Sequence, residues 1–166
     1  IRTIDLDKEG LKQFENTAVE TFCGNLNDRE LVRSAVKGVD AIIGTHPHYV
    51  QEIVFDEAAG TLVAYSLGDF ISNGTKSGTE YSIVLELEIT KDHKTGKTVI
   101  SGYHYTPIFT VSDEETLRVV RLKEAMAEYE GKYLGRVSKE TYNDMDYAMD
   151  RIADRVVKDE ETDAKK

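Results

Sequence analysis

The order of apolar and polar residues predicts alternating helices and strands in the first third of the chain. Apolar side chains recur at helical spacing over residues 8–22, which predicts a helix there. Asn27 followed by Glu30 forms a capping-box-like start for a second helix, and Gly38 is a plausible stop. The apolar run at 39–43 then predicts a buried strand.

The middle of the chain predicts antiparallel strands. Residues 51–56 and 61–66 have the composition of two strands joined by a turn. Apolar and polar residues alternate over 80–90, which predicts a half-buried strand, and 98–105 is expected to return as its partner. The segment 68–78 contains three glycines with serine, asparagine and threonine, and it predicts a loop.

Two helices are expected after these strands. Ser112 and Glu115 form a second capping box, which predicts a helix that ends near Glu130. Ser138 can cap a last helix, whose apolar stripe runs up to the polar segment 158–166. That segment is expected to be a disordered tail. The pattern as a whole predicts an α/β fold.

Length, charge and cysteine content limit the classes of function. The 166 residues suit one domain, which we expect to span residues 1–157. The net charge of −10 argues against nucleic acid or an anionic membrane as a partner, and a polyanionic substrate would need a bridging cation. No stretch approaches the ~20 apolar residues of a membrane span.

The single cysteine, Cys23, excludes an internal disulfide and a cysteine-rich zinc site. Because the first residue is Ile1 rather than methionine, we expect a part of a longer protein.

The residues best suited to chemistry are His46 and His48, which lie two apart in the segment 44–51 after the predicted strand 39–43. Pro47 favours an extended conformation at His46, and in an extended chain residues i and i+2 point to the same side. The pair could therefore present two imidazoles to one metal ion at the carboxyl end of a strand, where α/β sheets bind their ligands. An isolated His-x-His pair is also compatible with ring nitrogens that only hydrogen-bond to the backbone. Zinc needs three or four ligands, so the others must come from elsewhere.

A second polar strand end lies at residues 65–70. Its Asp69 could orient a histidine N–H through a hydrogen bond, or it could be a turn aspartate that binds its own backbone. Ser66 is the other candidate there for a contact with a substrate or with a ligand histidine. His93, in a polar turn, and His104, in a strand, are expected to have no ligand role.

Two blocks resemble a known family. Residues 38–51 resemble the G-A-D-x-V-I-G-x-H-P-H-V-x-Q block of the CapA-type poly-γ-glutamate capsule-synthesis proteins. Residues 64–70, Ala-Tyr-Ser-Leu-Gly-Asp-Phe, resemble their Y-S-L-G-N-F block. The resemblance is strong over about residues 28–72 and looser as far as Pro107. No motif of the family covers the final helices.

The resemblance implies a fold, a cofactor and a role. The fold would be the C-terminal part of a calcineurin-like metallophosphoesterase sandwich, with a mixed sheet, flanking helices and two C-terminal helices. His46 and His48 match the family's last metal-binding histidine pair, so they would be both catalytic residues and ligands of divalent manganese, zinc or iron. The family is linked to making, anchoring or exporting poly-γ-glutamate or a similar anionic capsule polymer at the bacterial cell surface or outside the cytoplasm.

The chain also departs from the family. The early Gly-Asp and Asn-Asn-His blocks that supply the other ligands do not occur, and Leu26 stands where a Gly-Asn-His histidine would be. The His-Trp-Gly-x-Glu block is absent too, and Asp69 replaces the usual asparagine. We therefore expect half of a metal site, completed by a missing N-terminal half of the same domain.

Three hypotheses remain open at this point. The first is a metal-dependent hydrolase, phosphoesterase-like, of which this chain carries one half. The second is a non-catalytic module that binds polymer or scaffolds a cell-envelope assembly. The third is a structural fragment whose histidines bind only backbone.

Overall fold

The computed structural model describes residues 2–5, 8–24, 28–72, 76–112, 116–130 and 137–156. The chain divides into two compact units, residues 1–39 and residues 40–166. The predicted tail at 158–166 lies outside the described residues, and the extent of one partial domain over 1–157 stays a prediction.

The described part of the first unit contains a parallel pair of strands and short helices, of which α2 is the longest. Its elements are β1 (Arg2–Asp5), α1 (Lys8–Leu11), the 3-10 helix η1 (Lys12–Phe14), β2 (Glu20–Cys23) and α2 (Arg29–Val36), and β1 pairs in parallel with β2. The carboxylate of Asp28 accepts hydrogen bonds from the backbone N–H groups of Glu30 and Leu31 and caps α2. Gly38, with φ of +70°, follows its end. The second helix is thus confirmed, with Asp28 as its cap, whereas Asn27 lies outside the described residues.

The predicted helix over 8–22 is wrong beyond Phe14. Asn16 has φ of +64°, which a right-handed helix does not allow, and the Thr17 hydroxyl donates to the Phe14 carbonyl and closes a turn. Residues 20–23 then pair with β1, where threonine and phenylalanine suit a strand. Strand pairing therefore prevails over the helical spacing of the apolar residues.

The second unit begins with a mixed three-stranded sheet. Its strands are β3 (Ala41–Ile43), β4 (Ile53–Asp56) and β5 (Thr61–Ala64), in the order β3-β5-β4. β3 runs parallel to β5, and β4 and β5 form an antiparallel hairpin with a turn at 57–60. This confirms the predicted hairpin, although both strands are shorter than expected.

The predicted strand at 39–43 is confirmed, but its burial is wrong. Ile42 is 37% exposed and Ile43 is 49% exposed. Among the described strands, β3 lies at an edge of the sheet and pairs only with β5. An edge strand has cross-strand side-chain neighbours on one side only, which contributes to the exposure of the two isoleucines.

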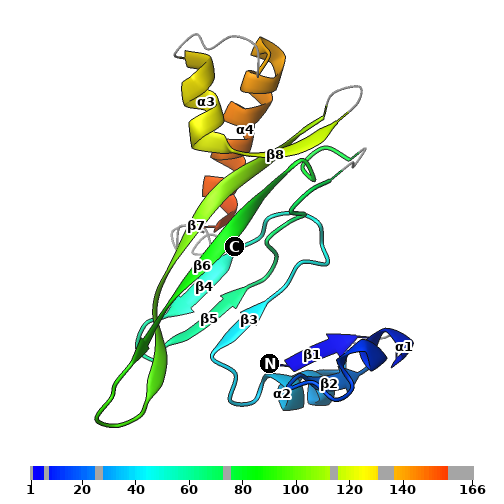
Figure 1. The fold of residues 1–166 in the computed structure, drawn as a ribbon, viewed down its shortest axis with the longest axis vertical. Coiled ribbons are helices and arrows are strands. Elements are labelled where there is room, and N and C mark those ends of the chain that lie inside the picture. The colour runs from blue at the N-terminus through cyan, green and yellow to red at the C-terminus, as the bar shows by residue number, and fades with distance from the viewer. Residues whose placement is uncertain are drawn as a thin grey trace, which may run out of the picture. The chain divides into compact units, whose positions relative to one another are not determined.

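A second, antiparallel sheet contains the longest strands. These are β6 (Tyr81–Lys91), β7 (Thr98–Ser112) and β8 (Leu117–Arg121), in the order β6-β7-β8. Figure 1 shows β6 and β7 as a long hairpin. The alternation predicted for 80–90 is confirmed over residues 83–88, where exposure alternates along the strand. It is wrong at both ends, because Ser82 is buried and Ile89 is 66% exposed. The described part of the predicted loop at 68–78 has no helix or strand.

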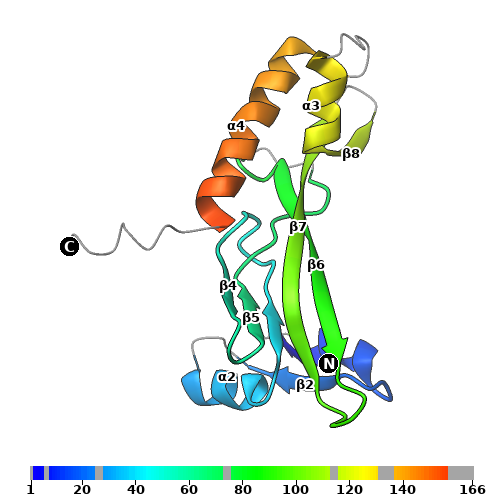
Figure 2. The ribbon, with the colours of Figure 1, turned by 90° about the vertical axis from the view of Figure 1, so that its left-hand side faces the viewer.

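The core lies between the two sheets and extends under two C-terminal helices. These helices are α3 (Leu122–Glu130) and α4 (Lys139–Val156), which lie side by side at one end of the β6–β7 hairpin (Figure 1, Figure 2). The Ser138 hydroxyl accepts a hydrogen bond from the Thr141 N–H and caps α4, as predicted. The most deeply buried core residues are Val50, Leu62, Ala64, Tyr81, Leu122, Met145, Ala148, Ile152 and Val156.

The predicted helix after Ser112 begins ten residues too early. Ser112 ends β7, and Glu115 lies outside the described residues. Residues 117–121 form β8, where the adjacent β-branched Val119 and Val120 pair with β7. The helix starts only at Leu122.

The architecture confirms the α/β class, whereas the calcineurin-like sandwich stays a prediction. No helix in the described part of the chain combines the length and the apolarity needed to cross a membrane.

Replacing Ile152 with alanine tests whether α4 belongs to the core. Ile152 is 1% exposed, so we expect the free energy of unfolding to fall by about 2–5 kcal/mol through lost burial and a new cavity. Urea unfolding can be followed by tyrosine fluorescence, because the chain has nine tyrosines and no tryptophan. Asp146→Ala, on the exposed side of the same helix, should change the free energy of unfolding by about 0.5 kcal/mol at most. Equal losses in both variants would contradict this placement.

Candidate functional site

Gly44 joins β3 to the backbone that continues β5. Its N–H donates to the Ala64 carbonyl at 2.9 Å, and its carbonyl accepts from the Leu67 N–H at 3.1 Å. A Cβ on Gly44 would lie 2.3 Å from the carbonyl oxygen of Tyr65. Only glycine therefore allows the two backbones to approach this closely.

The loop 44–51 returns to the same stretch of backbone from the opposite side. There the Gln51 N–H donates to the Ser66 carbonyl at 2.9 Å, and the Tyr65 N–H donates to the Glu52 carbonyl at 3.0 Å. The start of the loop therefore lies along one side of residues 64–67, and its end lies along the other side. Both of its ends are held by backbone hydrogen bonds to one strand extension.

The two candidate histidines lie on a tight turn of this loop, at the carboxyl ends of β3 and β5. The His48 N–H donates to the Thr45 carbonyl at 3.1 Å, and His48 has φ of +63°. Residues 45–48 therefore form a turn in place of the predicted extended segment, and this turn lets the loop reverse and reach the other side of β5. The two rings nevertheless lie close together, with centroids 5.8 Å apart and planes at 46°.

Asp69 contacts one of these rings. Its Oδ1 lies 2.8 Å from Nδ1 of His48, with the histidine side chain 59% exposed and the aspartate 27% exposed. Gly68 precedes it with φ of +79°, and a Cβ there would lie 2.8 Å from Cβ of Ser82. The left-handed glycine turns the chain so that Asp69 leaves β5 next to the loop. The predicted contact with a histidine is present, and the role of Asp69 in holding a ligand stays a prediction.

Ser66 lies beneath the turn rather than on its surface. It is fully buried, and its hydroxyl donates to the Thr45 carbonyl at 3.5 Å and accepts from the Gly68 N–H at 3.3 Å. These bonds connect the start of the histidine turn to the glycine before Asp69. They give Ser66 a supporting position, and a contact between Ser66 and a substrate stays a prediction.

The remaining histidines lie elsewhere. His104 pairs with Glu88 through Nε2 and Oε1 at 2.8 Å on the β6–β7 hairpin, and His93 lies in the exposed turn that follows β6. Among the described residues, no cluster of three or more histidine, cysteine, aspartate or glutamate side chains could hold a metal ion. His46 and His48 are the candidates because their rings lie side by side, and Asp69 is a candidate because it contacts His48.

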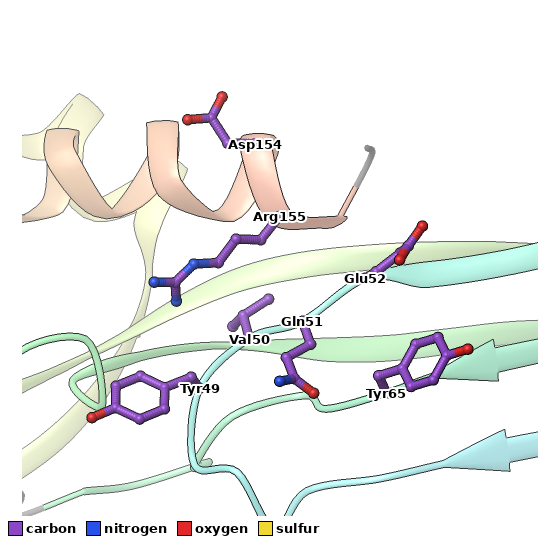
Figure 3. A pocket seen from close by; sticks show the side chains of 7 residues that line it. All are labelled: Tyr49, Val50, Gln51, Glu52, Tyr65, Asp154 and Arg155. Atoms are coloured by element: carbon purple, nitrogen blue, oxygen red, sulfur yellow. The ribbon is translucent and has the colours of Figure 1, made fainter. Parts of the chain in front are cut away.

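Two cavities flank the site within the second unit. One, of about 510 Å³, is mainly apolar and is lined by residues that include Thr45, Asp69 and the exposed Phe70 and Ile71. The other, of about 570 Å³, lies between the segment 49–52 and the last turn of α4 (Figure 3). Sequence reasoning missed the second cavity, because it joins residues about a hundred positions apart and neither part carries a recognisable motif.

Comparison with known proteins confirms the family resemblance over part of the chain. Residues 22–74 match the family model described as bacterial capsule synthesis protein PGA_cap. No curated protein and no solved structure gave a significant match. The matched segment runs from β2 through the histidine turn to just beyond Asp69, so it contains the whole candidate site. The family indicates a role in capsule synthesis and thus in the cell envelope.

Replacing Gly44 with alanine tests the close backbone contact. The new Cβ would meet the Tyr65 carbonyl oxygen, so the strand must shift, and we expect the free energy of unfolding to fall by about 1–3 kcal/mol. Urea unfolding measures the change. In Gly102→Ala the Cβ would meet only the flexible Glu88 carboxylate at 3.0 Å, so this control should change stability by about 1 kcal/mol at most. A stable Gly44→Ala protein would contradict the described backbone contact.

His48 offers a test of the left-handed turn. Alanine keeps the steric cost of φ at +63°, whereas glycine removes it. We expect His48→Gly to be more stable than His48→Ala by about 1 kcal/mol, because the left-handed conformation costs an L-residue about that much. Thermal unfolding of the two variants checks the order. If alanine proved equal or better, His48 would not hold this conformation in solution.

Proposed function

We propose that His46, His48 and Asp69 form one half of a divalent-metal centre in a capsule-synthesis protein that acts on an anionic polymer such as poly-γ-glutamate. The observation that carries the proposal is the pair of imidazoles 5.8 Å apart on an exposed turn at the carboxyl ends of two parallel strands. Ligands of α/β sheets collect at this edge.

The contact with Asp69 prepares His48 to bind a cation. A carboxylate only accepts hydrogen bonds, so in the neutral ring Nδ1 carries the proton and Nε2 keeps a free electron pair. Metal-binding histidines usually make this bond with their second nitrogen, which fixes the tautomer and the ring orientation. His46 supplies the second imidazole from the same turn.

The donors of this chain fit only part of a complete centre. Zinc in proteins takes three or four ligands, and the described residues contain no cluster of three candidate donors. We therefore propose that the other ligands come from the N-terminal half of the same domain that the family resemblance implies. When bound, manganese, zinc or iron would supply the Lewis acidity of a metallophosphoesterase-like hydrolase.

The charge of the chain supports a cation between protein and polymer. With a net charge of −10, the chain repels a polyanion in the absence of a bridging ion. A divalent ion at the histidine turn would neutralise charge where the polymer approaches. We place this function at the bacterial cell surface or outside the cytoplasm, in accordance with the role of the family.

A non-catalytic role is the alternative function. It is supported by the exposure of the histidine turn, which can contact a polymer at the surface without cleaving it. In that case the same surface would hold polymer or scaffold a cell-envelope assembly. Metal-dependent cleavage of poly-γ-glutamate or of a phosphodiester by the protein would exclude this alternative.

Zinc titration followed by NMR of the imidazole protons tests the metal proposal. We expect the His46 and His48 signals to shift at lower zinc concentration than those of His93 and His104, because two imidazoles act together. His46→Ala and His48→Gly should each weaken zinc binding by about tenfold or more, and Asp69→Ala by about tenfold. Glycine is preferred at position 48 because it suits the positive φ.

The His104–Glu88 pair provides a matched control. It has the same 2.8 Å separation between ring nitrogen and carboxylate as His48–Asp69, but among the described residues His104 has no second imidazole beside it as His48 does. Glu88→Ala should leave zinc binding unchanged. The proposal fails if His104 responds at the same zinc concentration as His48, or if the His46→Ala, His48→Gly double variant keeps its affinity.

A further inference from the structure

The cavity of about 570 Å³ differs in chemistry from the histidine turn. Its lining residues are Tyr49, Val50, Gln51, Glu52, Tyr65, Asp154 and Arg155. The first four belong to the segment that flanks the extension of β5, Tyr65 belongs to that extension, and the last two belong to the final turn of α4. Figure 3 shows the Arg155 side chain reaching from the helix towards Tyr49 and Val50. The volume lies within the range typical of small-molecule sites.

The guanidinium of Arg155 is incompletely paired. Its Nη1 atom is buried and makes no hydrogen bond to any part of the chain that the structure describes. The guanidinium carbon lies 5.8 Å from the centre of the Tyr81 ring, a contact that offsets a part of the cost of burial. A buried cationic donor without an acceptor is unfavourable. Because Arg155 also lines the cavity, a ligand that brings an acceptor to its guanidinium would be favoured there.

We propose that this cavity binds the carboxylate of a small peptide-like ligand, with Arg155 as its receptor. A guanidinium presents parallel N–H groups that match the two oxygens of a carboxylate. Gln51 adds an amide that can both donate and accept, which suits a peptide group next to the carboxylate. The rings of Tyr49 and Tyr65 offer apolar faces for the rest of the ligand.

The acidic residues of the cavity set the charge of the ligand. Figure 3 shows the carboxylates of Glu52 and Asp154 pointing away from the Arg155 guanidinium. They leave Arg155 accessible to one carboxylate and repel ligands with more negative charge. A single carboxylate is therefore favoured over phosphate, which carries more charge near neutral pH. The site uses none of His46, His48 or Asp69, so it does not depend on the proposed metal centre.

Binding of N-acetyl-L-alanine, followed by NMR of the arginine Nε–H signals, tests the inference. This probe has one carboxylate and one peptide group. We expect the Arg155 signal to shift on titration, and the methyl ester of the probe, which lacks the charge, to bind about tenfold more weakly or worse. The same loss is expected for Arg155→Met. Arg155→Lys keeps the charge and the long stem but loses the planar fork, and should lose less affinity than the methionine variant.

Arg151→Met is the matched control. Arg151 lies one turn earlier on α4, is exposed, and stacks its guanidinium over Tyr147 at 5.0 Å. Its replacement makes the same change in net charge and should leave binding unchanged. The inference is overturned if the probe and its ester bind equally, if Arg155→Met keeps full affinity, or if inorganic phosphate binds more tightly than the probe. The ester comparison uses the unaltered protein, so it remains decisive even if a variant misfolds.

Discussion

The second unit depends on the backbone hydrogen bonds that hold residues 64–67 between Gly44 on one side and residues 51–52 on the other. These bonds continue the sheet past the end of β5 and fix both ends of the histidine loop. The Leu67 carbonyl also accepts from the Ile83 N–H at 3.0 Å, so the same stretch connects the two sheets. The site and the core are therefore positioned by one short segment of main chain.

Much of this arrangement could be predicted from residue types that act locally. The apolar run at 39–43, the residues of the turn at 57–60 and the alternating apolar residues of β6 indicate strand, turn and strand from the sequence alone. The errors occur where a partner distant in sequence decides the structure. The residue pattern predicts helices over both 20–22 and 117–121. Residues 20–23 form a strand because they pair with β1, and residues 117–121 form a strand because they pair with β7. A single sequence does not reveal those partners.

The same limit applies to the functional residues. The sequence indicated that Asp69 could orient a histidine, but only the folded chain shows that it contacts Nδ1 of His48 rather than binding its own backbone. Arg155 carried no signal at all, because an arginine near the end of an amphipathic helix is typical of a solvated surface. Its significance arises from the burial of one nitrogen atom, unpaired among the described residues, and from its place in a cavity that residues 49–52 also line.

The left-handed conformation of His48 connects stability with the proposed function. A non-glycine residue with φ of +63° costs the fold about 1 kcal/mol, so packing and hydrogen bonds elsewhere must compensate for it. The bonds of Gly44, Gln51 and Ser66 do so by fixing the loop ends and its underside. The conformation in turn places the His48 ring beside both His46 and Asp69. A histidine, rather than the glycine that the backbone would favour, is understandable at this position if its imidazole serves a ligand.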